Sequence, residues 1–584
     1  MQRVAQAEPR QNVCLNGMWK LAVEGEAGLC DVRVPGSFSG QNKLWGREHW
    51  NTWDYPERWF NKAAVVYRTM FVPDALAGKR VLIRFNGVRH MVRVSVNGRE
   101  VGTWADSYVP FSFDITDLVN PGENKLAVHI GAEATCGLYE DDNSNRRGIY
   151  RDAFLQVVPE LRVDDDVHLR TLLREHRIHY LLPLRNDSKT TRHVKLRFRV
   201  TNPEGVSVLQ WADDRVHTVQ SLEKRCVEVS KDWNNPHLWS IDDPYLHHIH
   251  TDVVDADTGD VIDHHQLRFG FREITWAKAK LYLNGEELYL RGNGDHPLGD
   301  LEGGKPFAEA MIRKLKSLGV QCMRMHNLPR HQEMYEAGDE LGFMYFSEAS
   351  HHFRLPDPEF AKAHMARLVT YLRNHPCVLA WSVSNELHWR KIEEPKYLID
   401  VCRENDPTRP AFASDFTAWS LHGDLISRHY CAEMIWDEWV KHGNEKPMIW
   451  DELGDVWQHD RNLDTGPAGY EIYGQDVATG IYRDGMDIVR FLKEFSYGRE
   501  IDGEFRRVTC YVPWEFGYNF FRFLPFNNMN KMYQKYDALD QPGGIRIDSV
   551  PPCGNTTNIW DPTLPAFQPN PALYCFKDYL ECVR

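Results

Sequence analysis

Two glutamates that end apolar runs can act together as a catalytic pair. Glu386 closes the run VLAWSVSNE, and Glu452 closes the run PMIWDE. Two carboxyl groups about 5–5.5 Å apart suit retaining glycoside hydrolysis, in which one is the nucleophile and the other donates and then accepts a proton. Mutual repulsion keeps one of them protonated near neutral pH. A single glutamate at such a place is as often a helix N-cap or a surface ion pair, so the prediction depends on the pair.

Neighbouring polar residues fit the same chemistry. Asn385, directly before Glu386, can bond a sugar 2-hydroxyl, a contact that strengthens in the transition state. Tyr430 ends LISRHY and can steady the nucleophile carboxylate, and Trp514 can support the apolar face of a sugar ring. The other candidates for substrate binding also follow apolar runs: Asp295, His296, Arg324, His326, Asn327, Glu348 and His429.

The elements that must position these residues form an alternating pattern after about residue 276. Apolar runs of strand length alternate there with helical patterns such as FAEAMIRKLKSLG and HQEMYEAGDELG. The strand-like runs are LYLRGNGDHP, QCMRMHNLP, FMYFSEAS, VLAWSVSNE, AFASDF, LISRHYC, PMIWDELG and VTCYVPWEF. Eight such units predict a (β/α)₈ TIM barrel over residues 276–584, with its chemistry at the C-terminal ends of the strands. Carboxylates that end the fourth and seventh strands then face one another across the barrel mouth.

The first part of the chain reads as two β-sandwiches. Residues 1–160 hold short strands, and Asn97-Gly98 between alternating runs predicts a type I′ hairpin, because both central residues need positive φ. These features predict a jelly-roll sandwich. Residues 161–275 carry further alternating runs, and their number and length suit an immunoglobulin-like sandwich. The predicted fold is therefore multidomain, with a jelly roll, an immunoglobulin-like sandwich and a barrel.

Composition excludes several classes of partner. The chain has 584 residues and a net charge of −14, which disfavours nucleic acid and anionic membrane surfaces. No C-x-x-C pair, no 18-residue apolar run and no apolar leader are visible, so we expect no zinc ribbon and no membrane span. The expected location is cytoplasmic, or periplasmic or secreted if a signal was removed. The sequence leaves a homo-oligomer open.

Several segments resemble glycoside hydrolase family 2, the family of β-galactosidase, β-glucuronidase and β-mannosidase, and the resemblance covers essentially the whole chain. WFNKAAVVYRTMFVP and GIYRDAFLQVVP resemble its sugar-binding domain, NHPCVLAWSVSNE resembles its acid/base signature, and KPMIWDELG resembles its nucleophile strand. The resemblance implies that Glu386 is the general acid/base and Glu452 the nucleophile. It also implies that Asn385 bonds the 2-hydroxyl, Tyr430 bonds Glu452, and Trp514 lines the glycone pocket.

Two departures from the family pattern bear on the site. The family often has Arg-x-x-His-x-Pro in its second barrel strand, whereas RMHNLP here moves the histidine by one position. Because one position reverses the facing direction in a strand, either His326 or Asn327 is the substrate contact. Asp451 stands beside Glu452 where the family more often has a small residue. Strand alternation points it away from Glu452, into a buried polar network.

One region of the sequence has residue types that could bind a metal. Some β-galactosidases of this family hold Mg²⁺ near the acid/base, and Glu348, His351 and His352 occupy that region here. They do not reproduce the spacing, and a two-carboxylate mechanism needs no metal. We expect no metal and no cofactor.

The expected partner is a carbohydrate with a non-reducing β-linked sugar. Galactose is the first expectation, with glucuronic or galacturonic acid second, because Arg291, Arg324, Arg522 and Lys531 are cations that can reach a C6 carboxylate. A catalytically silent carbohydrate-binding protein is the rival from another class. A transglycosylase would share the covalent intermediate and differ only in the acceptor.

Overall fold

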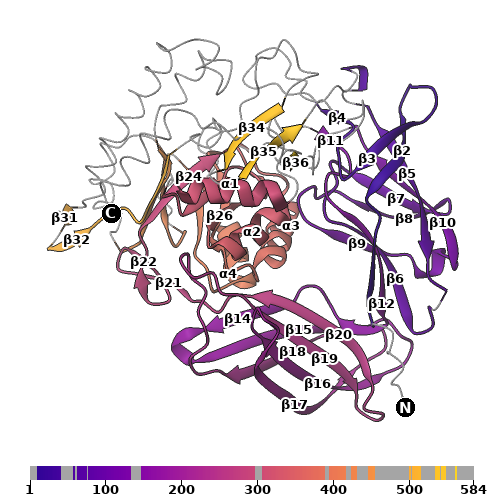
Figure 1. The fold of residues 1–584 in the computed structure, drawn as a ribbon, viewed down its shortest axis with the longest axis horizontal. Coiled ribbons are helices and arrows are strands. Elements are labelled where there is room, and N and C mark those ends of the chain that lie inside the picture. Colours follow the sequence, from indigo (N-terminus) through magenta and orange to yellow (C-terminus); the bar gives the residue numbers. More distant parts are fainter. Residues whose placement is uncertain are drawn as a thin grey trace.

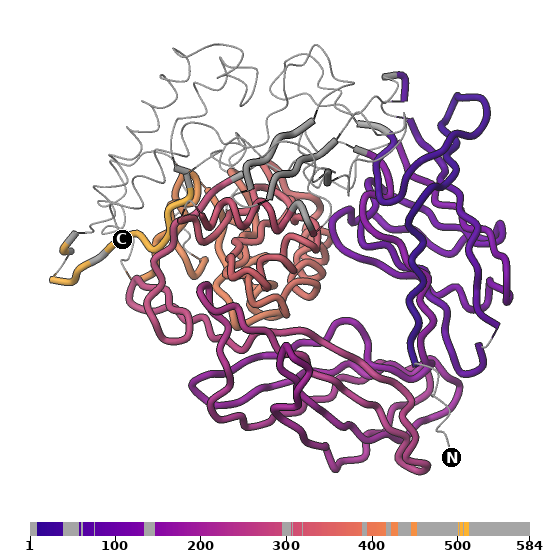
Figure 2. The backbone as a smooth tube through the Cα atoms, in the orientation of Figure 1, coloured from indigo at the N-terminus to yellow at the C-terminus, as the bar shows by residue number. Residues whose placement is uncertain are grey.

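The computed structural model describes residues 9–40, 57–59, 62–74, 76–132, 146–295, 305–317, 319–387, 394–415, 422–429, 445–453, 499–501, 503–513, 533–538, 541–546 and 560–561. They form two β-sandwiches and a parallel barrel, which confirms the predicted multidomain fold. Figure 1 and the tube in Figure 2 show the N-terminal sandwich in indigo beside the barrel and the second sandwich in magenta below it. None of the helices in these ranges is long and apolar enough to cross a membrane.

The first sandwich packs a six-stranded antiparallel sheet on a four-stranded one. The larger sheet has the order β3 (Cys30–Val34), β2 (Gly17–Val23), β5 (Ala64–Val72), β10 (Gly122–Ile130), β7 (Val92–Val96) and β8 (Arg99–Trp104). The smaller has the order β1 (Gln11–Cys14), β12 (Ala153–Pro159), β6 (Lys79–Phe85) and β9 (Phe111–Asp114). Between β7 and β8, Asn97 and Gly98 have φ of 51° and 78°, as the type I′ prediction requires.

The second sandwich is also antiparallel, and its inward side chains alternate with exposed ones along each strand. One sheet contains β13 (Leu161–Val163), β15 (Arg177–Asn186), β14 (His168–Leu172) and β18 (Lys224–Asp232). The other has the order β17 (Ser207–Val219), β16 (Arg192–Thr201), β19 (His247–Asp255) and β20 (Val261–Phe269). A small sheet of β21 (Ile274–Ala277), β22 (Lys280–Leu283) and β23 (Glu286–Glu287) leads into the barrel.

All eight predicted barrel strands are present and parallel. In spatial order they are β28 (Ala411–Ser414), β27 (Val378–Asn385), β26 (Met344–Glu348), β25 (Cys322–Met325), β24 (Leu290–Asp295), β33 (Cys510–Pro513), β30 (Met448–Leu453) and β29 (Ile426–His429). The end strands β28 and β29 adjoin, because the Asp424 amide donates to the Ala411 carbonyl at 2.8 Å. The barrel is thus nearly closed, and the C-terminal strand ends meet at one mouth.

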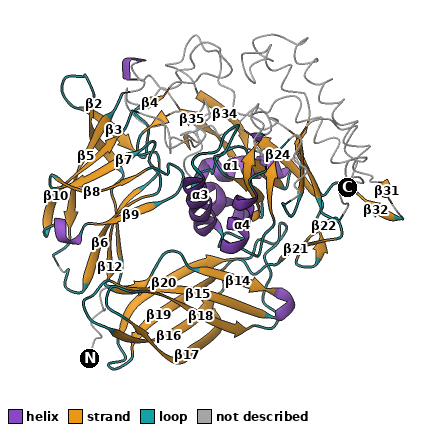
Figure 3. Ribbon diagram, turned by 180° about the vertical axis from the view of Figure 1, so that it is seen from behind, coloured by secondary structure: helices purple, strands orange, loops and turns teal. Residues whose placement is uncertain are grey.

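Helices cover the outside of the barrel, as Figure 3 shows from behind. They are α1 (Lys305–Ser317), α2 (Gln332–Leu341), α3 (Pro358–Leu372) and α4 (Lys396–Asn405). Asp357 caps α3 by accepting from the Glu359 amide at 3.0 Å, and Pro358 fits its first turn because that position needs no N–H donor. The short pairs β31 (Arg499–Ile501) and β32 (Glu504–Arg506), and β34 (Tyr533–Ala538) and β35 (Gln541–Arg546) with β36 (Trp560–Asp561), are antiparallel.

A loop of the first sandwich reaches the helix behind the Glu386 strand. Asp106, buried in that loop, accepts from His364 Nδ1 at 3.0 Å and from Arg367 Nη2 at 2.8 Å, both on α3. Burial raises the pKa of Asp106, but the two partners outweigh it and hold the pKa below the usual range. The His364 ring lies 5.3 Å from that of His351, whose Nδ1 donates to the Val383 carbonyl of β27 at 2.9 Å. The first sandwich therefore braces β27 from outside the barrel.

The second sandwich holds the opposite end of the same strand. The Trp239 indole N–H donates to the Asp339 carbonyl of α2 at 2.8 Å. The Arg272 guanidinium donates to the carbonyls of Pro376 and Val378 at 3.0 and 3.1 Å, where the chain enters β27. Because all of these groups are buried, losing one partner leaves the other unsatisfied.

We predict that Gly342→Ala destabilises the protein more than Gly205→Ala. Both glycines have positive φ (66° and 79°), so each substitution costs about 1 kcal/mol of backbone strain. At Gly342, which ends α2, a Cβ would also lie 2.1 Å from the Ile241 carbonyl oxygen of the second sandwich, whereas at Gly205 nothing lies within 4 Å. Thermal unfolding should show a clearly larger drop in Tm for Gly342→Ala. Equal drops would contradict a tight contact between the second sandwich and α2.

Candidate functional site

Glu386 lies immediately beyond the buried strand β27. All eight residues of β27 are buried, because one face of a barrel strand points inward and the other packs against helices. Glu386 then takes a φ of 49°, and its amide donates to the Ser414 carbonyl of β28 at 3.0 Å. Such a backbone costs about 1–3 kcal/mol in a residue with a side chain and is common at functional sites.

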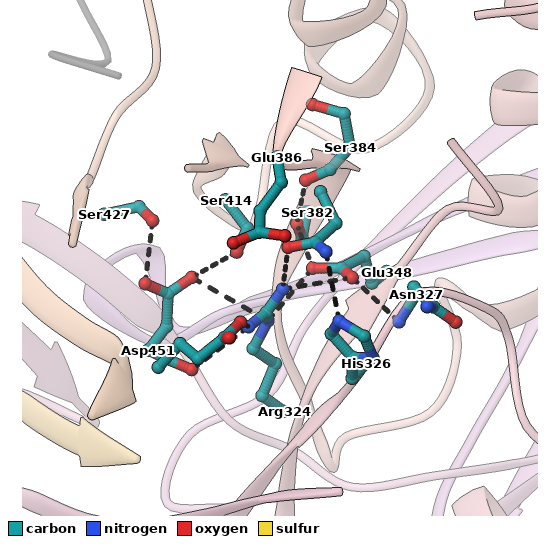
Figure 4. A network of polar contacts seen from close by, with 12 residues as sticks. Arg324, His326, Asn327, Glu348, Ser382, Ser384, Glu386, Ser414, Ser427 and Asp451 are labelled. Atoms are coloured by element: carbon teal, nitrogen blue, oxygen red, sulfur yellow. Dashed lines mark hydrogen bonds and ion pairs between the residues drawn. The ribbon is translucent and has the colours of Figure 1, made fainter. Parts of the chain in front are cut away.

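The barrel brings Glu386, directly after β27, and Glu452, in β30, to the same mouth. Figure 4 shows Glu386 there beside Arg324 and Asp451. One carboxylate oxygen of each and one ring nitrogen of His429 lie within 4.8 Å of one another. The two carboxylate side chains are only 9% and 3% exposed. The pair predicted from separate stretches of sequence therefore shares one largely buried space.

The Arg324 guanidinium, at the end of β25, ties the carboxylates of the mouth together. It donates from Nη1 to Glu452 at 2.8 Å and from Nε to Glu348 at 3.1 Å, and the Asn385 side-chain oxygen also accepts from it. Burial lowers the pKa of Arg324, but the carboxylates of Glu348, Asp451 and Glu452 raise it above the usual range. Arg324 is thus a fixed positive charge within an acidic cluster.

Glu348 is held from three sides. Besides Arg324, it accepts from the Ser382 hydroxyl and from the Asn327 backbone amide, each at 2.8 Å. Asn327 points its amide there because it turns with a φ of 52°, just past β25. Burial still raises the pKa of Glu348 above its ordinary value, against the opposing effect of Arg324.

Asn385 is fixed by its neighbours. Its side-chain amide donates to His326 Nε2 at 3.0 Å and to His352 Nδ1 at 2.6 Å, and its oxygen accepts from Arg324. Both N–H groups are therefore engaged by protein, and the oxygen keeps a second lone pair for an incoming hydroxyl. The sequence leaves either His326 or Asn327 as the substrate contact. In the structure His326 accepts a hydrogen bond from Asn385, whereas the Asn327 side chain lies 3.3 Å from His352.

Asp451 forms the buried polar network expected of it. It accepts from the hydroxyls of Ser414 and Ser427 at 2.6 and 2.7 Å and from the Arg428 amide at 3.1 Å. Simple alternation does not hold here, because the β29–β30 register shifts at this point and His429 pairs with Glu452. This bulge lets Asp451 come within 3.8 Å of Arg324 on the same side as Glu452. The sequence missed both serines, since a serine near a strand end carries no distinctive signal.

His429 ends β29 between the two carboxylates. Its Nδ1 lies 3.3 Å from a Glu386 oxygen and 3.4 Å from a Glu452 oxygen. Burial lowers the pKa of His429, but Glu452 and Asp451 outweigh it and raise the pKa to about 9. The ring therefore adds a second positive charge to the cluster at neutral pH.

Four of the predicted site residues lie wholly or partly outside the described residues, and one predicted cation lies away from the mouth. His296, Tyr430 and Trp514 lie outside the described residues, as does the side chain of Asp295 at the end of β24. The expectation that Arg291 reaches the mouth is wrong. As the second residue of β24 it lies at the opposite end of the barrel, where its Nε donates to the Gly319 carbonyl at 3.0 Å.

Within the part of the chain that the structure describes, two groups of side chains resemble metal ligands in type and proximity. Asp339, His375 and Cys377 offer atoms within 4.8 Å of one another, but His375 and the Cys377 amide already bond Asp339, and the Arg268 guanidinium lies 3.2 Å from it. The second group is Glu386, His429 and Glu452, and the Arg324 guanidinium lies 2.8 Å from Glu452. Since each group already contains a neutralising cation, we assign neither of them a metal.

The chain belongs to glycoside hydrolase family 2. Three domains described for that family match it in order: "Glycosyl hydrolases family 2, sugar binding domain" over residues 13–159, "Glycosyl hydrolases family 2" over 161–272, and "Glycosyl hydrolases family 2, TIM barrel domain" over 274–459. These matches follow the two sandwiches and the barrel in sequence.

Relatives in sequence agree with this family, and a solved structure shares the fold. A β-galactosidase of Thermoanaerobacter pseudethanolicus is 27% identical over 360 residues, 59% of this chain and 47% of the relative. A Formosa agariphila protein, provisionally named a β-glucuronidase, is 26% identical over 383 residues, 61% of this chain and 44% of its own. The chain thus spans less than half of these relatives. The structure of a β-glucuronidase from an uncultured Clostridium sp. covers all of both chains with a TM-score of 0.67 at 19% identity, a likeness of fold.

We predict that replacing Arg324 makes stability depend more steeply on pH. Arg324→Met leaves Glu348 and Glu452 buried without their cation, which should cost about 3–5 kcal/mol. Without the cation the pKa of each carboxyl rises above its value in the unfolded chain. The free energy of unfolding is then highest at low pH, where each carboxyl is protonated, and it falls as pH rises through the raised pKa. Thermal unfolding should therefore show a larger loss at about pH 8 than at about pH 5. Arg324→Lys keeps the charge and should lose less, whereas a loss that is independent of pH would contradict the ion-pair role.

Proposed function

We propose that the protein is a retaining exo-β-glycosidase that hydrolyses terminal non-reducing β-linked sugars, with β-D-galactosides as the first substrate class. The observation that carries the proposal is the approach of the Glu386 and Glu452 carboxylates to within 4.8 Å. Retaining enzymes place their carboxyl groups about 5–5.5 Å apart, whereas inverting enzymes need about 6.5–9.5 Å to admit a water. A nearest-oxygen separation of no more than 4.8 Å is compatible with the shorter spacing and supports direct attack by one carboxylate.

Glu452 is the nucleophile in this proposal. Its 2.8 Å bond to Arg324 favours the ionised form, which is the form that can attack the anomeric carbon. Glu386 is the general acid/base, since it lies at the more exposed edge of the pair, 9% against 3%, where an aglycone oxygen can reach it. In the first step the C1–Glu452 bond forms and the aglycone oxygen leaves with a proton. In the second, water attacks C1, Glu386 accepts a proton from it, and the C1–Glu452 bond breaks to release the carboxylate.

The remaining site residues have positioning and binding roles. Asn385, held by His326 and Arg324, would meet the 2-hydroxyl, a contact that strengthens in the transition state. Tyr430 beside the nucleophile and Trp514 under the sugar ring belong to the proposal through the family resemblance.

Galactosides come first because the Thermoanaerobacter relative is named a β-galactosidase. Terminal β-D-glucuronides and β-D-galacturonides are the second candidate, supported by the name of the Formosa relative. A uronate needs a cation for its C6 carboxylate, and Arg324 is already neutralised by Glu348 and Glu452. The second candidate therefore depends on Arg522 or Lys531.

The substrate class is tested by a hydrolysis panel. The chromogenic β-galactoside, β-glucuronide, β-galacturonide, β-mannoside, β-glucoside and α-L-arabinopyranoside are compared at saturating concentration by kcat/KM. We expect the β-galactoside to be cleaved fastest, with net retention of anomeric configuration by NMR. Faster cleavage of a uronide would establish the second candidate, and binding without cleavage of any sugar would establish a carbohydrate-binding protein. Products formed on added sugar acceptors would reveal a transglycosylase.

Replacing each carboxylate separates the two roles. Glu452→Gln removes the nucleophile and should lower kcat by several orders of magnitude for every leaving group, while sugar binding persists. Glu386→Gln should lower kcat/KM on the order of 10²–10⁴-fold for a substrate with a poor leaving group. It should lower kcat/KM much less for a dinitrophenyl glycoside, because dinitrophenolate leaves without a proton. External azide should then restore turnover of Glu386→Gln by giving a β-glycosyl azide. Equal loss with both leaving groups would contradict the assignment of Glu386 as the acid.

A further inference from the structure

His429 is placed where it can exchange a proton with both proposed catalytic carboxylates. Its Nδ1 is nearly equidistant from Glu386 and Glu452, at 3.3 and 3.4 Å, and its ring is fully buried. The family resemblance attaches no proton-transfer role to this position. The two-carboxylate mechanism by itself assigns no role to an imidazole between the carboxylates.

The hydrogen bonds on the other side of the ring determine where its protons are. The Ser414 hydroxyl donates its only proton to Asp451 at 2.6 Å. At 2.9 Å from the same hydroxyl oxygen, His429 Nε2 must therefore be the donor. With Nε2 protonated, a neutral ring would point the Nδ1 lone pair at two carboxylates. A proton on Nδ1 replaces that repulsion with two charge-assisted contacts.

The charges around the ring favour this protonated form. Glu386 faces it from the end of β27, Glu452 and Asp451 from β30, Ser414 from β28, and the Arg324 guanidinium from β25. The acidic neighbours outweigh burial and Arg324, and the pKa of His429 is raised to about 9, with Glu452 as the largest raising contribution.

We propose that His429 is a further catalytic residue, which stores the acid proton while Glu452 is ionised and passes it to Glu386 as Glu452 becomes an ester. This role rests on the proposed function. In the resting site the proton is then held on His429, with both glutamates ionised. The resting position of the acid proton therefore differs from a scheme in which Glu386 alone carries it.

The proton balance closes over both steps. As the C1–Glu452 bond forms and the C1–aglycone bond breaks, the proton on His429 Nδ1 passes to Glu386 and from Glu386 to the aglycone oxygen, which leaves His429 neutral and Glu386 ionised. In the second step water attacks C1, its proton returns through Glu386 to His429, and Glu452 leaves as a carboxylate. No oxidant, metal or further reactant is needed.

The driving force is the charge of Glu452. While it is ionised, a cation 3.4 Å away is stabilised, and this attraction is strong because both groups are buried. Esterification removes that negative charge, so the imidazolium loses its main stabilising neighbour while the cost of burial remains. The proton therefore becomes easier to release at the moment when the leaving group needs it.

The test is the pH profile of His429→Gln, which keeps a polar group of similar reach that does not titrate. The alkaline limb of kcat/KM should lie near the raised pKa of His429 in the wild type, about 9, and fall by roughly two pH units or more in the variant. With Glu386 left as the only acid, the variant should lose on the order of 10²-fold at about pH 8 for a poor leaving group and little for dinitrophenolate.

Ser414→Ala is the second variant and guards against misfolding of the first. It removes the acceptor of Nε2–H, so a neutral ring protonated on Nδ1 becomes available, and the alkaline limb should shift in the same direction by less. Circular dichroism and Tm check the fold of both variants. An unchanged alkaline limb with equal loss for both leaving groups would overturn the proposal. The proposed function would still stand after that outcome if the wild type hydrolyses the substrate and Glu452→Gln does not.

Discussion

Among the described residues, the site depends on balancing the buried carboxylates of Glu348, Glu386, Asp451 and Glu452 against the Arg324 guanidinium that lies between them. Burying an uncompensated charge costs several kcal/mol, so the Arg324 guanidinium is the condition under which this cluster can exist. Its fork contacts Glu452 and Glu348 in directions that a single ammonium could not match. The protonated His429 ring supplies the second positive charge.

The fold supplies the geometry that this balance needs. Parallel strands deliver their C-terminal ends to one mouth, so residues from β25, β26, β27, β29 and β30 meet there although they are far apart in sequence. Both sandwiches reinforce β27, the first through Asp106 and α3 and the second through Arg272. A strand supported at both ends can hold the strained backbone of Glu386, which a mobile loop would release.

Local sequence rules were sufficient for the elements. The Asn97-Gly98 hairpin and all eight barrel strands follow from turn chemistry and apolar runs, which depend on neighbouring residues alone. The rules failed where neighbouring chains intervene. Alternation placed Asp451 away from Glu452, but a bulge against β29 brings both toward Arg324. The charge of Arg291 suggests a cation at the mouth, but its position near the start of β24 places it at the other end of the barrel.

The sequence by itself determined the two carboxylates, the asparagine before one of them and the family pattern around them, because each of these features is local. Only the tertiary structure decided how close Glu386 and Glu452 come, since strand order and register set that distance. It also decided that His429 stands between them and that its Nε2 faces a serine whose proton is already used by Asp451. Protonation in a buried cluster is a property of all the charges that surround a group, and no stretch of sequence contains them together.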